Sequence, residues 1–212
     1  MYNEETIVRL QFVGKILSLF THQLNNHLAI IKDSLGFLRD IAELKGIGKE
    51  DAQEIMETIN SLDEEIVKAT FLSKKLNSFG HRMDSELSTF NLNDVTDEIL
   101  TLLSRATIEK RLGFVREYGE LGPLNGNPSL FQFVLFCLID RYIKSLPPRG
   151  RLRVKTFEWE NSVRLLLEPM DELLGEVNPF CPDHIIHLGA EKLSCTIWSD
   201  KSTGRTEIQV LS

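Results

Sequence analysis

The strongest constraint on this fold is an apolar seam that continues without interruption along the first part of the chain. Its members are apolar or small residues that recur at alternating intervals of four and three, which places them along one face of a helix. They are Leu10, Gly14, Leu17, Thr21, Leu24, Leu28, Ile31, Leu35, Leu38 and Ala42. The seam predicts one helix from about Glu5 to Leu44, roughly 60 Å long at 1.5 Å per residue.

A second helix with the same pattern follows. The segment Lys45-Gly46-Ile47-Gly48 supplies two glycines for a helix end and a turn, and the next seam predicts a helix from about Glu50 to Phe79. Its seam residues are Ile55, Ile59, Leu62, Ile66, Ala69, Ser73 and Leu76. Two consecutive seams of this kind predict an antiparallel helical hairpin.

The hairpin cannot cover all of its own apolar surface. Each helix also carries apolar side chains that flank the seam, namely Phe12, Ile16, Phe20, Met56 and Phe71. We expect a second copy of the chain to cover the seams, which gives a homodimeric four-helix bundle. The alternative is an intramolecular bundle, or a hairpin docked on the carboxy-terminal part of the same chain.

The polar run from Gly80 to Ser85 predicts a boundary between a hairpin domain over residues 1–83 and a second domain over residues 86–212. The second domain reads as alternating helices and strands. We expect helices over 94–109 (capped near Asn93), from Asn127-Pro128-Ser129 through Tyr142, and over 183–192, with strands over 112–117, 151–158, 162–168, 194–199 and 206–211. This pattern predicts an α+β fold with helices on one face of a mixed sheet.

Composition narrows the function classes. The chain has 212 residues and a formal net charge of -7. It has no dense basic stripe, which argues against a nucleic-acid partner. Three distant cysteines give no disulfide framework or zinc site, and the longest apolar run, Phe133 to Ile139, is too short to cross a bilayer. The start of the chain lacks the basic residues of a signal peptide, so we expect a cytoplasmic protein without a membrane partner.

His22 stands out on the first predicted helix. It falls one position past the seam, which places it on a shoulder that faces water, with Ser18 one turn before it and Asn26 one turn after it. An accessible imidazole can act as a nucleophile near neutral pH, as a phosphoryl acceptor must. The alternative is a surface histidine without a task, and we give that interpretation to the other four: His27, His81, His184 and His187.

His22 and the residues that follow it resemble a motif of a known protein family. The segment His22-Gln23-Leu24-Asn25-Asn26-His27-Leu28 resembles the H-box of sensor histidine kinases, and Thr89 to Val95 resembles the start of their ATP-binding domain. Residues 128–144 and 150–155 lie where the N-box helix and the next strand belong. The resemblance covers nearly the whole chain and implies a dimeric hairpin with the phosphoacceptor His22, followed by an ATPase-like α/β sandwich.

The departures from that family bear on its nucleotide site. Phe136 and Asp140 stand where the N-box helix carries two asparagines, the second a magnesium ligand in the family, and only Asp140 could replace such a ligand. The segment from Glu168 to Glu176 lacks the Asp-x-Gly-x-Gly turn and instead carries Asp171, Glu172 and Glu176, and residues 187–190 are all that remains of the glycine-rich lid. Gln23 replaces an acidic residue and cannot act as a base. We therefore expect a degenerate ATP-binding domain that binds no cofactor or metal.

An acceptor histidine on a dimeric hairpin with a degenerate ATPase domain resembles the histidine phosphotransferases of bacterial phosphorelays, of the sporulation-initiation and cell-cycle type. That resemblance implies that His22 relays a phosphoryl group between aspartates of response-regulator receiver domains, which supply the Mg²⁺. A hybrid histidine kinase is a further partner that fits this role. Two alternatives are a non-catalytic module that binds a receiver domain or a kinase, and a divergent active histidine kinase.

Supporting roles follow for the neighbours of His22. Asn26 could orient the ring or hydrogen-bond the phosphoryl oxygens, and Gln23 lies beside it. Folding the hairpin about Gly46 brings Lys74 and Lys75 within reach of the phosphoryl charge. For Asn26 and the two lysines the alternative is a solvated side chain. A receiver domain would dock just below, on Asn25, Ala29, Lys32 and Asp33.

Overall fold

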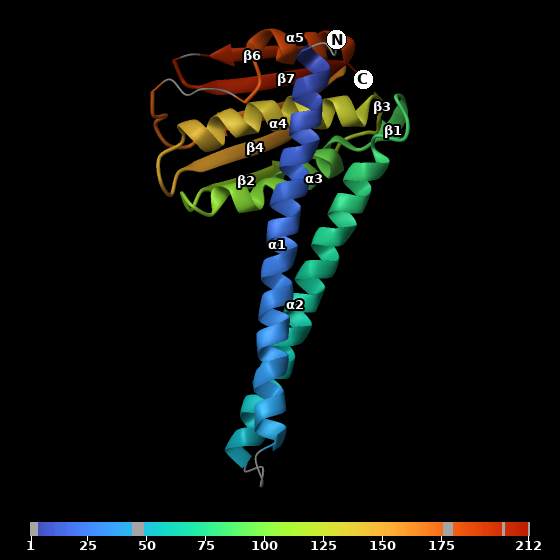
Figure 1. Cartoon of the computed structure of the whole chain (residues 1–212). Helices are drawn as coiled ribbons and strands as arrows, with labels where there is room; N and C mark the ends of the chain where they lie inside the picture. The colour runs from blue at the N-terminus through green and yellow to red at the C-terminus, as the bar shows by residue number, and fades with distance from the viewer. Residues whose placement is uncertain (1–3, 44–48, 176–179, 201, 212) are drawn as a thin grey trace.

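The protein consists of a long helical hairpin and a sandwich of helices on a sheet (Figure 1). The computed structural model describes residues 4–43, 49–175, 180–200 and 202–211. Helix α1 spans Glu4–Glu43 and helix α2 spans Lys49–His81, so both predicted helices are confirmed to within two residues at each described end. The predicted glycine turn at 45–48 lies outside the described residues. Across the parts of the chain that are described, none of the helices combines the length and the apolar character that a membrane span needs.

The amino-terminal part of α1 buries a different stripe from the one that defines its seam. Val8, Phe12 and Ile16 on α1 are 6%, 2% and 0% exposed, because they pack onto the second domain. The seam residues Leu28 and Leu35 are 50% and 52% exposed within one chain. The amino-terminal part of α1 is therefore docked on the carboxy-terminal domain, as the alternative interpretation expected, while Leu28 and Leu35 of its seam remain half exposed.

The second domain follows the predicted order of elements. It comprises β1 (Ser88–Phe90), α3 (Leu92–Thr107), β2 (Gly113–Tyr118), β3 (Leu124–Gly126), α4 (Pro128–Ser145), β4 (Arg151–Trp159), β5 (Ser162–Pro169), α5 (Asp183–Lys192), β6 (Cys195–Asp200) and β7 (Arg205–Leu211). Among the described residues, five strands form one sheet in the order β2-β4-β5-β7-β6, in which β2 and β4 are parallel and the other neighbours are antiparallel. The short pair β1 and β3 forms a separate antiparallel ribbon, and β3 was not predicted.

Helix caps explain two of the boundaries. Asn127 caps α4, its Oδ1 accepting from the Leu130 amide at 2.8 Å, and Pro128 occupies the first turn as predicted. The predicted cap at Asn93 is wrong: Asn91 caps α3, and its Oδ1 accepts from the Asn93 amide at 2.8 Å. Asn93 instead donates from Nδ2 to the Gly119 carbonyl at 2.9 Å. The helix starts earlier because Leu92, fully buried, belongs to the core.

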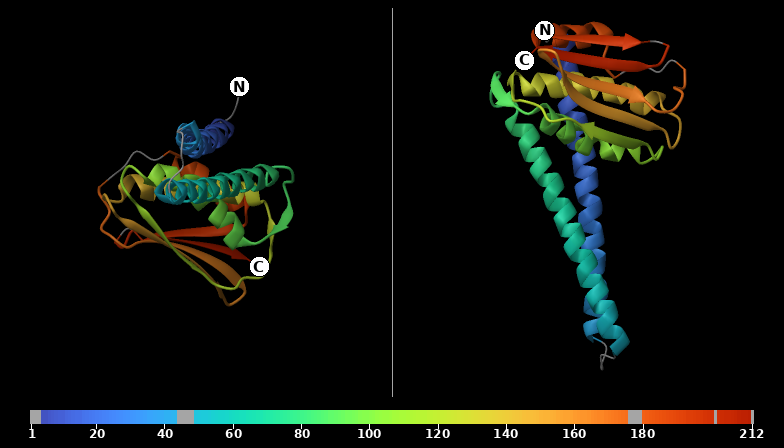
Figure 2. Two further views of the ribbon diagram at one scale, coloured as in Figure 1. Left: turned by 90° about the horizontal axis from the view of Figure 1, so that it is seen from below. Right: turned by 180° about the vertical axis from the view of Figure 1, so that it is seen from behind.

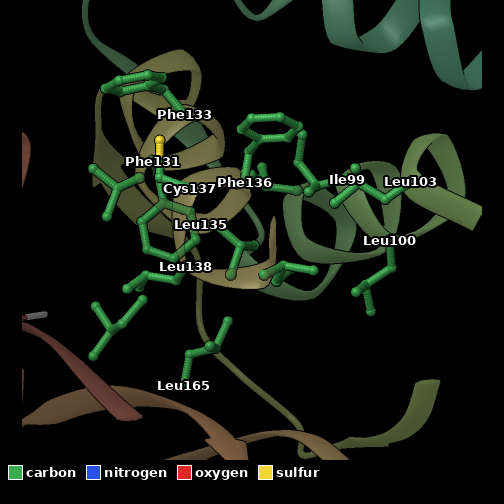
Figure 3. Close-up of a cluster of buried hydrophobic side chains, with 14 of the residues drawn as sticks. Ile99, Leu100, Leu103, Phe131, Phe133, Leu135, Phe136, Cys137, Leu138 and Leu165 are labelled. Carbon is green, nitrogen blue, oxygen red and sulfur yellow. The ribbon is translucent and has the colours of Figure 1, made fainter. Parts of the chain in front are cut away.

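The main core lies between the sheet and the layer formed by α3, α4 and α5. Figure 2 (left) shows the hairpin on one side of this helix layer and the sheet on the opposite side. In Figure 3, Phe136 of α4 lies beside Ile99 of α3, and Leu138 of α4 lies above Leu165 of the sheet. Helix α3 is thus packed between the sheet and the hairpin, so its outward side chains meet α1.

Candidate functional site

His22 lies in the middle of α1 with its imidazole exposed to solvent. A solvent-open groove of about 550 Å³ passes along this part of the helix. It is lined by Leu17, Ser18, Thr21, His22, Asn25 and Asn26. The predicted row of Ser18, His22 and Asn26 therefore lies on one surface, and the ring can be approached from the side of this groove.

Helix α3 brings an arginine to the same imidazole. Nη2 of Arg105, in the last turn of α3, lies 3.3 Å from Nε2 of His22. A second groove, of about 300 Å³, joins the two residues and is also lined by Ser18, Leu19, Ala106 and Glu109. The sequence offered no signal for this pairing, because 83 positions separate the two residues and neither helix pattern specifies the contact.

Gln23 fixes α1 against α3 at the same level. Its Nε2 donates to Oγ of Ser104 at 2.7 Å, and Ser104 in turn donates to the Thr101 carbonyl at 2.7 Å. Gln23 is only partly exposed, unlike its neighbour His22. The residue that replaces the family's acidic neighbour therefore acts as a link between the hairpin and the second domain, which holds Arg105 at the ring.

The two lysines expected near His22 have other surroundings. Nζ of Lys75 lies 2.8 Å from Oδ2 of Asp97, whose other oxygen lies 3.1 Å from Nε of Arg116. Asp97 lies eight residues before Arg105 on α3, which is about 12 Å along the helix axis. Lys74 is exposed to solvent. The cation that the structure places at His22 is Arg105, and Lys75 instead ties α2 to the start of α3.

His27 has a structural partner that its sequence position did not reveal. Its Nδ1 lies 2.6 Å from Oε2 of Glu65 on α2, and Lys68 lies 2.7 Å from the other oxygen of that buried carboxylate. The hydrogen bonds from Lys68 and then from His27 lower the pKa of Glu65. The prediction that His27 has no task is therefore wrong. It holds the two helices of the hairpin together.

Asp140, the one residue at these N-box positions that could chemically replace a magnesium ligand, is neutralised by neighbouring cations. Asp140 on α4 is 2% exposed, and its carboxylate pairs with Lys15 from α1 and, at 2.8 Å, with Lys144. The Lys15 ammonium also lies 5.4 Å and 5.3 Å from the ring centroids of Phe136 and Phe180. Two cations and two aromatic rings around a buried carboxylate fit a magnesium ion poorly. The described residues also contain no cluster of three or more His, Cys, Asp or Glu side chains that could hold a metal.

The segments that align with nucleotide-binding loops have structural roles here. Oδ2 of Asp171 accepts from the Arg151 amide at 2.8 Å, and Glu168 pairs with Arg153 at 2.6 Å. Gly189 lies inside α5, where an added Cβ would stand 2.7 Å from the Val134 side chain on α4. It is a helix-packing glycine rather than part of a phosphate loop. Glu176 lies outside the described residues. These surroundings fit a triphosphate poorly as well.

Comparison with known proteins gives a partial match in sequence. No family model matches the chain. The signal transduction histidine-protein kinase AtoS of Escherichia coli (strain K12) is 24% identical over 155 residues, which cover 73% of this chain and 24% of that protein. The chain therefore spans about a quarter of the length of this curated relative.

Solved structures match the fold. The catalytic domain of histidine kinase ThkA superposes with a TM-score of 0.51 at 15% identity, covering 60% of this chain and 96% of that one. Histidine kinase ThkA in complex with response regulator protein TrrA superposes with a TM-score of 0.50 at 16% identity, covering 98% and 64% of the two chains. The chain thus has the architecture of a histidine kinase core, a helical hairpin followed by an ATPase-like α/β sandwich, as predicted.

Proposed function

We propose that this chain is a histidine phosphotransferase that relays a phosphoryl group between aspartates of response-regulator receiver domains through His22. One observation carries the proposal: an exposed imidazole opens onto a solvent-filled groove on a histidine-kinase hairpin, with an arginine at its Nε2. The groove leaves room for the donor aspartate of another protein. Asn26, which lines the same groove, is retained as a positioning residue.

Two features favour a phosphoryl donor other than ATP. Asp140 is neutralised by Lys15 and Lys144, so it lacks free charge for a magnesium ion. The second feature concerns Phe136, the other position where the N-box helix of the kinases carries an asparagine. The docked amino-terminal part of α1, which also provides Lys15, covers it. In the proposed relay the receiver domain supplies the Mg²⁺ and most of the charge stabilisation, so this chain contributes a positioned histidine.

A receiver domain is the expected partner. ThkA, which has the same architecture, was solved in complex with the response regulator TrrA. In this chain Asn25, Ala29, Lys32 and Asp33 are exposed on α1 just beyond His22, where a docked receiver would contact the hairpin. We place the protein in the cytoplasm with such receivers, and a hybrid histidine kinase remains a further expected partner.

The proposed active form is a homodimer. Leu28 and Leu35 on α1 are half exposed within one chain, and so is Ile66 on α2. These side chains repeat at the seam spacing, which is the pattern that a second hairpin would cover to form a four-helix bundle. Pairing of two copies through the seams also leaves His22, one position off the seam, accessible.

We predict that Leu35→Glu weakens the dimer about a hundredfold or more, because an unpaired carboxylate in an apolar seam costs several kcal/mol. Sedimentation velocity should show wild-type protein at twice the chain mass of 24.2 kDa and the variant near the chain mass. Asp33→Lys, at an exposed position off the seam, is the matched control and should remain dimeric. A wild-type protein that sediments as a monomer at micromolar concentration would contradict the dimer.

The choice of donor tests the proposed function. Wild-type protein mixed with a phosphorylated receiver, without ATP, should acquire phosphate that is stable to base and labile to acid. The same protein mixed with ATP and Mg²⁺ in place of the receiver should stay unlabelled, because the residues at the family's nucleotide site fit a triphosphate and a magnesium ion poorly. Labelling by ATP alone would favour the divergent kinase, and tight receiver binding without labelling would favour the non-catalytic module.

A further inference from the structure

We propose that Arg105 is the phosphoryl-binding residue of this site, and that it holds the imidazole nitrogen of His22 until the phosphoryl group arrives. This inference rests on the proposed function and deepens it. Arg105 belongs to the second domain, whereas His22 belongs to the hairpin. The site is therefore composed of both domains, and the degenerate sandwich contributes a functional group to it.

The contact between Arg105 and His22 indicates which ring nitrogen of His22 carries the proton and which one acts as the nucleophile. A guanidinium can only donate hydrogen bonds, so Nη2 of Arg105 donates and Nε2 of His22 accepts over the 3.3 Å that separates them. The proton of the neutral ring then resides on Nδ1. The lone pair at Nε2 points at Arg105, and both residues line the second groove; this lone pair is the nucleophile that a phosphorus atom would meet there. At 3.3 Å this hydrogen bond is long, and it can be exchanged for a stronger one.

The charge of Arg105 favours its moving from Nε2 of His22 to the oxygens of a phosphoryl group. Within the described residues Arg105 forms no ion pair, whereas Asp97 further back on α3 is paired with both Lys75 and Arg116. Arg105 thus presents a guanidinium without an ion-pair partner among the described residues at the acceptor nitrogen, and the carboxylate of Glu109 lines the same groove. A phosphoryl group on Nε2 brings two negative charges, and a guanidinium binds phosphate oxygens with two parallel hydrogen bonds.

The transfer step needs only His22, the receiver's aspartyl phosphate and the Mg²⁺ that the receiver supplies. Nε2 attacks the phosphorus of the receiver's aspartyl phosphate, the P–N bond forms, and the bond from phosphorus to the aspartyl oxygen breaks. The aspartate leaves with the electron pair, and the Nδ1 proton of the ring passes to water. Arg105 moves from Nε2 to the phosphoryl oxygens during this step, while the bond from Gln23 to Ser104 at 2.7 Å keeps α3 beside α1.

The test compares Arg105→Ala and Arg105→Lys with wild type, and uses Arg39→Ala as the matched control. Arg39 is exposed on the same helix as His22 but about 25 Å further along it. We expect Arg105→Ala to slow transfer from a phosphorylated receiver about tenfold to a hundredfold, the range for one charge-assisted hydrogen bond. Arg105→Lys keeps the charge without the fork and should recover part of that loss, and Arg39→Ala should match wild type.

A second measurement separates this inference from the proposed function. Phosphoramidate, a small phosphoryl donor, labels an accessible histidine without a receiver. The ³¹P resonance and the hydrolysis rate of phosphorylated His22 should then change in Arg105→Ala but not in Arg39→Ala. Identical resonances and lifetimes in the two variants would overturn the role of Arg105, even if the receiver labels the protein.

Failure of the receiver to label wild type, with the Arg105 effect intact in the phosphoramidate experiment, would instead count against the proposed function alone. A wild-type protein that phosphoramidate does not label at His22 would overturn the inference too, because Arg105 would then block the nitrogen rather than receive the phosphoryl group.

Discussion

His22→Ala will reduce the phosphate that the protein accepts from a phosphorylated receiver to background, the largest effect expected of any substitution in this chain. The physical reason is that the substitution removes the nucleophile itself, and no neighbouring side chain can replace it. Asn26 and Ser18 in the same groove are poor phosphoryl acceptors, and the guanidinium of Arg105 is not a nucleophile. Because His22 is exposed, the variant should fold and dimerise as wild type does.

His27→Ala is the matched control for that experiment. It makes the same chemical change on the same helix, but at a ring that is bonded to the buried Glu65 at 2.6 Å. We expect this variant to accept phosphate at His22 and to lose thermal stability, because Glu65 loses one of its two partners. Thermal melts followed by circular dichroism should show a loss of stability in His27→Ala but not in His22→Ala. Acid-labile label should be present in His27→Ala and absent from His22→Ala. Full labelling of His22→Ala would contradict the assignment of the acceptor.

Phe12→Ala will have the largest effect on stability. Its side chain is 2% exposed and joins three parts of the structure: the ring centroid lies 4.7 Å from that of Phe136, and 5.6 Å from those of Phe133 and Phe79. The substitution removes contacts with α2 and α4 together and leaves a cavity between the hairpin and the sandwich. We expect the free energy of unfolding to fall by about 3–5 kcal/mol, the usual range for a buried Phe→Ala change.

Chemical denaturation followed by circular dichroism, at several protein concentrations because the proposed dimer adds a concentration dependence, would measure this loss. Gln11→Ala is the matched control, since Gln11 is exposed beside Phe12 on α1, and it should stay within about 0.5 kcal/mol of wild type. A loss below about 1 kcal/mol for Phe12→Ala would show that the amino-terminal part of α1 does not dock on α4 as described.

Most of the fold could be predicted from periodicity and from residues that begin and end helices. The seams predicted α1 and α2, Asn127-Pro128 predicted the start of α4, and residues 183–192 proved to be α5. Local patterns of this kind report on structure formed by neighbours in the sequence. They could not reveal β3, because its three residues, Leu124–Gly126, are too few to show the alternation that marks a strand.

The candidate site could be predicted only in part, for a related reason. His22 was visible because its position relative to the seam places it in water. Arg105 was not visible, because its contact depends on how α3 packs against α1, and a helix pattern does not specify the partner of an outward arginine. Lys75 illustrates the converse: hairpin geometry predicted it within reach of His22, but Asp97 of another element pairs with it.

The relay itself can be followed directly in one pulse-chase measurement. Wild-type protein is labelled by a first phosphorylated receiver in buffer without ATP, separated from it, and mixed with a second, unphosphorylated receiver in the presence of Mg²⁺. Label on His22 should fall while label on the second receiver rises by the same amount, and His22→Ala should carry none between them. Label that reaches the second receiver equally well through His22→Ala, or only after ATP is added, would contradict a relay through His22.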